Sequence, residues 1–141
     1  MDTVLSNLGV SDEKFKSSLD KFFKLSMKIA NDSEEMSDEL ALYKDMIFHV
    51  YLPDLDYNIW IKTSENQLNY NTNRYEVIPK NSHAIHYILN RATVTKILRQ
   101  EMSAAEAYFK GLVTIDGELP DAIISRNILN LFFAYINYFM K

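Results

Sequence analysis

Apolar residues recur with the period of a helix in the first part of the chain. Phe15, Leu19 and Phe22 stand at steps of four and three within residues 11–31, and this spacing places them on one face of a helix. Ser11 precedes the run as an N-cap, where a hydroxyl satisfies a free backbone N–H group. The pattern therefore predicts an amphipathic helix that begins after Ser11 and ends near residue 31.

A second short helix is expected over residues 33–44, and the pattern then changes to alternation. Tyr57, Ile59 and Ile61 alternate with Asn58, Trp60 and Lys62, as in a strand with two different faces. Turn residues such as proline, asparagine and aspartate separate the apolar runs. Four strands are predicted in this part of the chain, at residues 46–52, 57–62, 68–72 and 83–89.

The remainder of the chain returns to helical spacing around one more strand. Helices are expected over residues 93–100, from Ser103 onward and over residues 120–140, with a strand at residues 112–115. Short consecutive strands with helices at both ends predict the α+β class. The expected architecture is a five-stranded, mostly antiparallel sheet covered on one face by helices.

Residues 103–118, SAAEAYFKGLVTIDGE, combine a capped helix, a glycine turn, a strand and a second glycine turn. Ser103 and Glu106 have the spacing at which a hydroxyl and a carboxylate cap the same helix start. Gly111 stands where a helix ends in a left-handed residue, and Gly117 ends the strand. The segment predicts a short helix and a strand joined by a tight turn.

Within this segment, residues 107–118, AYFKGLVTIDGE, resemble the signature of the sterol carrier protein type 2 (sterol-transfer) family, A-F-F/M-x-G-K-L-K-I-x-G-D/N. Leu112 and Thr114 replace two lysines of that pattern, so the basic lip of the family's strand is missing. The resemblance implies one sterol-carrier-like domain over residues 1–141, in which residues 1–10 are a loose lead-in. It also implies that the C-terminal helices form one wall and the lid of a tunnel for lipid-like molecules.

The last predicted helix is apolar on almost every side, which is typical of a helix that is buried, in a membrane or against a partner. Its most apolar run, residues 128–140, spans only about 20 Å as a helix, and Asn130 and Asn137 interrupt it. A membrane span needs roughly 20 apolar residues, so that interpretation is poor. Three alternatives stay open: core or dimer interface, wall of a ligand cavity, or contact with a membrane surface.

Composition excludes several classes of function. The 141 residues carry a net charge of −4 with a pI near 5.3, whereas a nucleic-acid-binding domain normally has a basic face. Cysteine is absent, so disulfides and thiolate chemistry are excluded. No basic start followed by an apolar run is present at the N-terminus, and a cytoplasmic location is expected.

No pattern typical of a catalytic or metal site is found. His49, His83 and His86 are the only histidines. His83 and His86 lie three apart on a predicted strand, so they point to opposite faces and cannot bind one metal ion. Neither a phosphate-binding glycine loop nor a nucleophile elbow occurs. The sequence thus predicts no enzyme activity, no metal and no cofactor.

We therefore expect a non-enzymatic carrier of lipid-like apolar ligands, of fatty-acyl, isoprenoid or sterol type, with the ligand in a cavity between sheet and helices. The alternative is an interaction or dimerisation module of the same fold without a cavity. Expected partners are a lipid-like small molecule, a membrane surface in transient contact and a second copy in a homodimer. The predicted ligand-binding residues are Trp60, Tyr108, Phe109, Val113, Ile115, Ile124, Ile128 and Phe132.

Two of these assignments have a structural alternative. For Trp60 the favoured interpretation is an anchor that packs the sheet against the helices, with ligand contact as the alternative. Tyr108 and Phe109 are neighbours on a helix and therefore point about 100° apart, so one is expected to face the sheet and the other a neighbouring helix.

Overall fold

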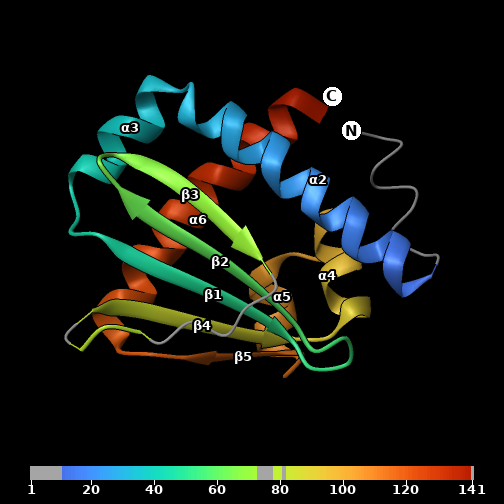
Figure 1. The fold of residues 1–141 in the computed structure, drawn as a ribbon. Coiled ribbons are helices and arrows are strands. Elements are labelled where there is room, and N and C mark those ends of the chain that lie inside the picture. The colour runs from blue at the N-terminus through green and yellow to red at the C-terminus, as the bar shows by residue number, and fades with distance from the viewer. Residues whose placement is uncertain (1–10, 73–77, 81, 141) are drawn as a thin grey trace.

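The computed structural model describes residues 11–72, 78–80 and 82–140. The predicted lead-in at residues 1–10 lies outside the described residues, as does most of the segment between the third and fourth strands. Figure 1 shows the described chain as one sheet with helices packed against it.

Five strands of the described chain form a single sheet in the spatial order β3-β2-β1-β4-β5. The strands are β1 Met46–Leu52, β2 Tyr57–Ser64, β3 Gln67–Thr72, β4 His83–Leu89 and β5 Val113–Asp116. Three of the neighbouring pairs are antiparallel, and β1 and β4 are parallel. The predicted mostly antiparallel sheet is confirmed, and the parallel pair in its centre is a feature that strand patterns did not indicate.

Within the described residues, five helices accompany the sheet: α2 Asp12–Asn31, α3 Glu34–Ala41, α4 Arg91–Leu98, α5 Ala104–Phe109 and α6 Leu119–Met140. The hydroxyls of Ser11, Ser33 and Ser103 each accept a hydrogen bond from the backbone N–H three residues later. These bonds satisfy donors that the first turn of a helix leaves free. The three helices therefore begin where the sequence places an N-cap.

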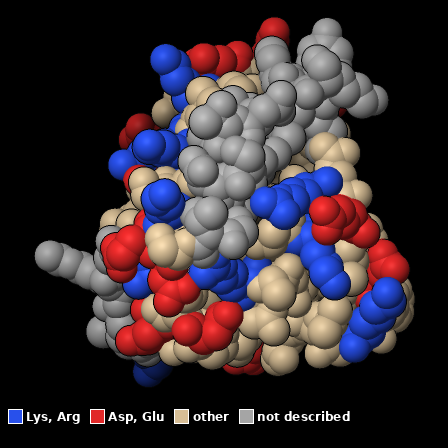
Figure 2. All heavy atoms as spheres, turned by 90° about the vertical axis from the view of Figure 1, so that its right-hand side faces the viewer, with Lys and Arg blue, Asp and Glu red and all other residues tan. Residues whose placement is uncertain are grey.

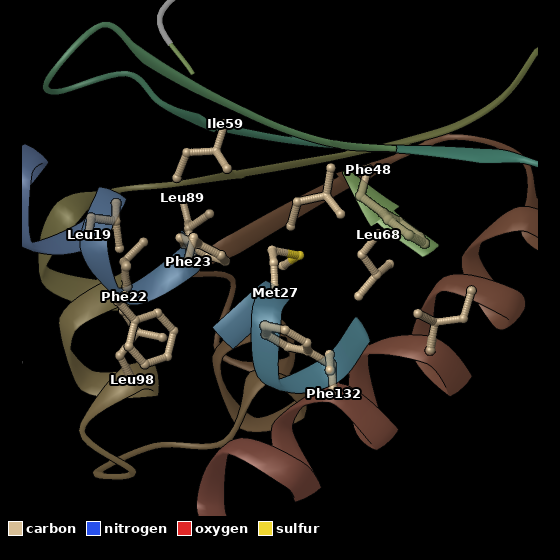
Figure 3. Close-up of a cluster of buried hydrophobic side chains, with 14 of the residues drawn as sticks. Leu19, Phe22, Phe23, Met27, Phe48, Ile59, Leu68, Leu89, Leu98 and Phe132 are labelled. Carbon is tan, nitrogen blue, oxygen red and sulfur yellow. The ribbon is translucent and has the colours of Figure 1, made fainter. Parts of the chain in front are cut away.

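The hydrophobic core fills the space between the helices and one face of the sheet. Figure 3 shows Phe23 and Met27 of α2 and Phe132 of α6 directed toward Phe48 and Ile59 of the strands. The buried residues of α6 follow one stripe at steps of three and four, so the described part of this helix packs against the core rather than standing free. No helix among the described residues is long and apolar enough to cross a membrane.

A polar bond ties the end of α2 to the edge of the sheet. The Asn31 side chain donates to the Leu68 carbonyl at 2.8 Å and accepts from the Leu68 N–H at 2.8 Å. Leu68 lies on β3, an edge strand whose outer side lacks a neighbouring strand among the described residues. Asn31 thus supplies both bonds that another strand would have made at this point.

Candidate functional site

An apolar cavity of about 140 Å³ lies between the sheet and the helices. All sixteen lining residues carry aliphatic or aromatic side chains, and every strand except β3 contributes to them, as do α2, α4, α5 and α6. The lining consists of Phe23, Phe48, Val50, Ile59, Ile61, Tyr87, Leu89, Val94, Ile97, Leu98, Ala104, Val113, Ile115, Leu129, Phe132 and Phe133.

The alternation of the strands directs these residues to the cavity. Val113 and Ile115 of β5 are two apart, so they share a face of the sheet, and they pair with Leu89 and Tyr87 of β4. The same face carries Phe48 of β1 next to Ile61 of β2. The inner wall of the cavity is therefore a continuous apolar face built from four neighbouring strands.

The single hydroxyl in the lining does not make the cavity polar. The Tyr87 hydroxyl and the Ser125 hydroxyl of α6 form a short hydrogen bond, and Ser125 is fully buried. Burial raises the pKa of Tyr87, against the opposing effect of its bond to Ser125. The hydroxyl is neutral at ordinary pH and already has a partner, so the cavity can solvate hydrocarbon but not a charged group.

The cavity reaches the surface at α5 and β5. Ala104 at the start of α5 and Ile115 on β5 both line the cavity and are both exposed to solvent. Other lining residues, such as Phe48, Ile59 and Phe132, are almost fully buried. The rim at Ala104 and Ile115 is therefore the place at which an apolar molecule would enter.

The structure brings together three of the eight predicted ligand-binding residues. Val113, Ile115 and Phe132 line the cavity. Ile124 and Ile128 of α6 pack with the hydrophobic core instead of lining the cavity. The sequence reasoning named none of the lining residues of α2, α4, β1, β2 and β4. The helical periodicity of residues 11–31 indicates a buried face on α2 but does not separate core residues from cavity residues.

The expectation that Tyr108 and Phe109 divide between the sheet and a helix is wrong. Both are exposed, Phe109 at 85% of its surface. Helix α5 has only six residues, and Ala107 is the one residue of this helix that is buried. The two aromatic rings contact each other edge to face on the outside of the molecule.

Trp60 lies on the opposite face of the sheet from the cavity. Its indole is 1% exposed and stacks on the imidazole of His49, with 3.9 Å between ring centroids and 10° between planes. It does not belong to the core between sheet and helices. The prediction that Trp60 packs the sheet against the helices is therefore wrong. Its partner is a side chain of the neighbouring strand β1.

His49 also joins two strands through hydrogen bonds. Its Nδ1 lies 2.8 Å from Nδ1 of His86 on β4, and its Nε2 lies 2.7 Å from Oδ1 of Asn58 on β2. The Asn58 oxygen can only accept a hydrogen bond, so Nε2 of His49 carries a proton. Nδ1 of neutral His49 is then the acceptor, and Nδ1 of His86 is the donor. Burial lowers the pKa of His49; the bond to Asn58 raises it, and the charge of His86 lowers it further.

The prediction that His83 and His86 point to opposite faces is confirmed. His83 Nδ1 bonds to Asp121 of α6 at 2.9 Å, on the helix side of the sheet, whereas His86 meets His49 on the other side. The pairing of His49 with His86 depends on the parallel register of β1 and β4, for which the sequence carries no local signal. The described residues hold no group of three or more side chains arranged to bind a metal ion.

Comparison with known proteins finds similarity of structure without similarity of sequence. No family model matches the chain, and no curated protein matches it. The solved structure of the UbiJ-SCP2 ubiquinone synthesis protein is similar with a TM-score of 0.54 and 13% identity, over 77% of this chain and 85% of that chain. Sterol carrier protein 2 from Yarrowia lipolytica, in its apo form, is similar with a TM-score of 0.51 and 13% identity, over 77% and 86% of the two chains.

A third similar structure belongs to a much longer protein. A double mutant of a sec-alkyl sulfatase is similar with a TM-score of 0.55 and 16% identity, over 92% of this chain but 17% of that chain. At such low identities the likeness is one of fold. The α+β arrangement, the strand order and the helix–strand segment at residues 103–118 together give this chain the sterol carrier protein 2 fold.

Proposed function

We propose that this protein is a non-enzymatic carrier that binds the hydrocarbon part of a lipid-like molecule in the cavity between its sheet and helices. The observation that carries the proposal is the lining of that cavity, in which every side chain is apolar apart from one hydroxyl that already has a partner. The fold, shared with a sterol carrier protein and with a ubiquinone synthesis protein, supports the same class of ligand.

The size of the cavity favours a flexible chain over a rigid ring system. Its volume of about 140 Å³ is near that of an engineered cavity of ~150 Å³ that holds benzene, and below the ~300–1,000 Å³ of typical ligand sites. An acyl or isoprenoid chain can enter end first, so the opening need be only as wide as the chain itself. A sterol nucleus would require several side chains to move at once.

The apolar lining also sets the orientation of the ligand. Transferring a charged or unpaired polar head group into such a cavity costs several kcal/mol, so the head group stays at the rim near Ala104 and Ile115. A segment of about six carbons offers roughly 5 kcal/mol at ~0.8 kcal/mol per methylene before the costs of association. Useful affinity therefore requires further contacts of the chain along the rim.

Uptake of a fluorescent acyl chain by delipidated protein tests the proposal, together with native mass spectrometry of protein expressed in a lipid-containing host. We expect saturable binding that Ala104→Phe weakens at least tenfold, because the larger ring blocks the rim. Ala105→Phe is the matched control, since Ala105 is the next residue of α5, is exposed and does not line the cavity. Absence of saturable uptake by the wild type, or equal effects of both variants, would rule the proposal out.

A further inference from the structure

We propose that the outer edge of β5, with the exposed apolar residues on either side of it, is an interface that binds a second copy of this chain. The two β5 strands would pair antiparallel about a two-fold axis and extend both sheets. This inference goes beyond lipid binding. It shares Ile115, at the rim of the cavity, with the proposed function, but it is argued from the exposed side chains and the strand edge and does not require a bound lipid.

Exposed apolar side chains are concentrated around β5. Among the described residues, six of the eight large hydrophobic side chains that are exposed come from residues 108–123, which comprise the end of α5, the strand and the start of α6. A concentration of exposed apolar side chains at one edge of a molecule is typical of an interaction surface. We name these residues the β5 patch: Tyr108, Phe109, Leu112, Ile115, Leu119 and Ile123.

The elements of the β5 patch lie together at one edge of the molecule. In Figure 1, β5 is the lowest strand, with α5 beside it and the start of α6 at its end. Figure 2 shows the right-hand side of that view, where uncharged residues, polar and apolar together, lie in the lower half of the face beside acidic and basic side chains. The start of α6 lies at the opposite end of β5, so the two halves of the patch flank the two ends of the strand.

The backbone of β5 distinguishes a protein partner from a lipid surface. One edge of the strand pairs with β4, and no strand of the described chain pairs with the other edge. A free edge presents N–H and C=O groups that another strand can satisfy, whereas the hydrocarbon of a bilayer offers them no partner. Glu106, Asp116 and Glu118 are exposed beside the patch, and with a net charge of −4 they disfavour an anionic membrane.

A two-fold axis at the centre of β5 makes the patch complementary to itself. An axis through Thr114 places Thr114 opposite Thr114 of the second copy, Val113 opposite Ile115 and Leu112 opposite Asp116, so directly opposed side chains share a face and no aspartate faces another. The two most exposed residues of the patch, Phe109 at 85% and Leu119 at 73%, flank opposite ends of the strand. Antiparallel pairing therefore brings Phe109 of each copy toward Leu119 of the other.

Charge does not oppose this arrangement. Lys110, which pairs with Glu106 of its own helix at 3.0 Å, and Glu118 lie beyond opposite ends of β5, so the two-fold axis does not bring two lysines or two copies of Glu118 together. A standard interface buries ~800 Å² per partner, to which the six side chains of the β5 patch, the pairing of the two strands and the polar border would all contribute.

Sedimentation velocity over a range of protein concentrations tests the proposal, with the full chain at neutral pH. We expect a dimer in equilibrium with monomer, and we expect Phe109→Asp to raise the dimer dissociation constant at least tenfold. Leu42→Asp is the matched control, because Leu42 follows α3, outside the patch, and is 70% exposed. Circular dichroism of both variants checks that the fold is intact.

The register is tested separately with spin labels, for which the absence of cysteine from the chain is convenient. A nitroxide on Thr114→Cys should give a short distance between the two copies, and one on Leu42→Cys a much longer distance. A monomer at every concentration, or a dimer that Phe109→Asp leaves unchanged, would overturn the proposal. So would a monomer that floats with phosphatidylcholine vesicles through Phe109, since the patch would then be a membrane contact.

Discussion

His49 is a buried histidine whose imidazole is held by three neighbouring side chains. Its imidazole stacks on Trp60 and bonds to Asn58 and His86 through its two nitrogens. The short contact between two Nδ1 atoms accommodates a single proton, because two protonated nitrogens would repel each other. Burial disfavours the charged imidazolium and lowers the pKa of His49, and the neighbouring His86 adds to this effect.

This lowered pKa predicts a loss of stability on the acid side of neutrality. Above about pH 6.5, the ordinary pKa of histidine, His49 is neutral in both the folded and the unfolded chain. Below that pH the unfolded chain binds the proton while folded His49 still resists it, so the free energy of unfolding falls as pH decreases. Urea unfolding at a series of pH values between 8 and 5 measures the effect.

A variant without the titrating group isolates the contribution of this one residue. His49→Gln keeps a polar side chain but removes the ionisation. The carboxylates contribute equally to the pH dependence of stability in the variant and in the wild type. We expect the variant to lose less stability than the wild type between pH 7 and pH 5. If the two curves run parallel over this interval, His49 is not the residue that makes the fold acid-sensitive.

The two glycines that flank β5 predict different costs for the same substitution. Gly111 has φ +75° and open space where a Cβ would be added, whereas a Cβ on Gly117 (φ +152°) would lie 2.5 Å from Cδ1 of Ile85 and 3.0 Å from the backbone oxygen of Ala84. Gly111→Ala should cost roughly 1 kcal/mol of stability through its positive φ alone. Gly117→Ala should cost about 2–4 kcal/mol because strain and overpacking add.

Urea unfolding of the two alanine variants side by side measures this difference. Gly111→Ala serves as the control for the backbone conformation, because it changes φ strain without a contact to a neighbour. Equal destabilisation would mean that β4 yields to the added methyl group at no cost, and that the close approach of Gly117 to β4 does not constrain this edge of the sheet.

At the scale of elements, Asn31 joins α2 to β3. Of the surface amide side chains, we expect this one to contribute most to the free energy of unfolding. Asn31→Ala would leave the N–H and the C=O of Leu68 without the partners they now have, at a cost of about 1–3 kcal/mol. Asn69→Ala is the control, since Asn69 is exposed and makes one long bond of 3.4 Å to the Lys62 carbonyl. The free energies of unfolding of the two variants test this, and similar small losses would show that water replaces Asn31.

The elements themselves follow from local chemistry, which explains why the sequence predicted their limits well. The N-caps Ser11, Ser33 and Ser103 act on the next three residues, β1 was predicted from a continuous apolar run, and the alternation of β2 and β3 is visible in the sequence itself. The parallel pairing of β1 with β4 is different, because it joins strands more than thirty residues apart. No local signal encodes that neighbour, and the contact of His49 with His86 could not be predicted without it.

At the scale of the molecule, the sequence predicted that an apolar site lies between sheet and helices but not which residues line it. Val113 and Ile115 were among the predicted residues because they lie on the strand of the segment that resembles the sterol carrier signature, and Phe132 because the last helix is apolar; all three line the cavity. Ile128 has the same character as Phe132 on the same helix, yet it packs in the core. The difference between a core residue and a lining residue is whether neighbouring side chains fill the space beside it, and this depends on packing of the whole molecule.

The same distinction gives a prediction that joins stability to ligand binding. Phe132 and Phe15 are both almost fully buried phenylalanines on helices, but only Phe132 lines the cavity. Replacing either by alanine should cost about 3–5 kcal/mol. In Phe132→Ala the deleted ring enlarges the cavity, so an added medium-chain fatty acid should bind the folded protein. This binding should restore part of the lost stability, and the recovery should grow with the ratio of fatty-acid concentration to its dissociation constant.

Thermal unfolding of both variants with and without the fatty acid measures this recovery. We expect the melting temperature of Phe132→Ala to rise with ligand and that of Phe15→Ala to rise no more than the wild type does. Leucine variants serve in their place if either alanine variant fails to fold, since they remove less volume from the same positions. Equal recovery at both positions would mean that the fatty acid fills any cavity made in the core, and recovery at neither would mean that the space between sheet and helices does not accept a chain.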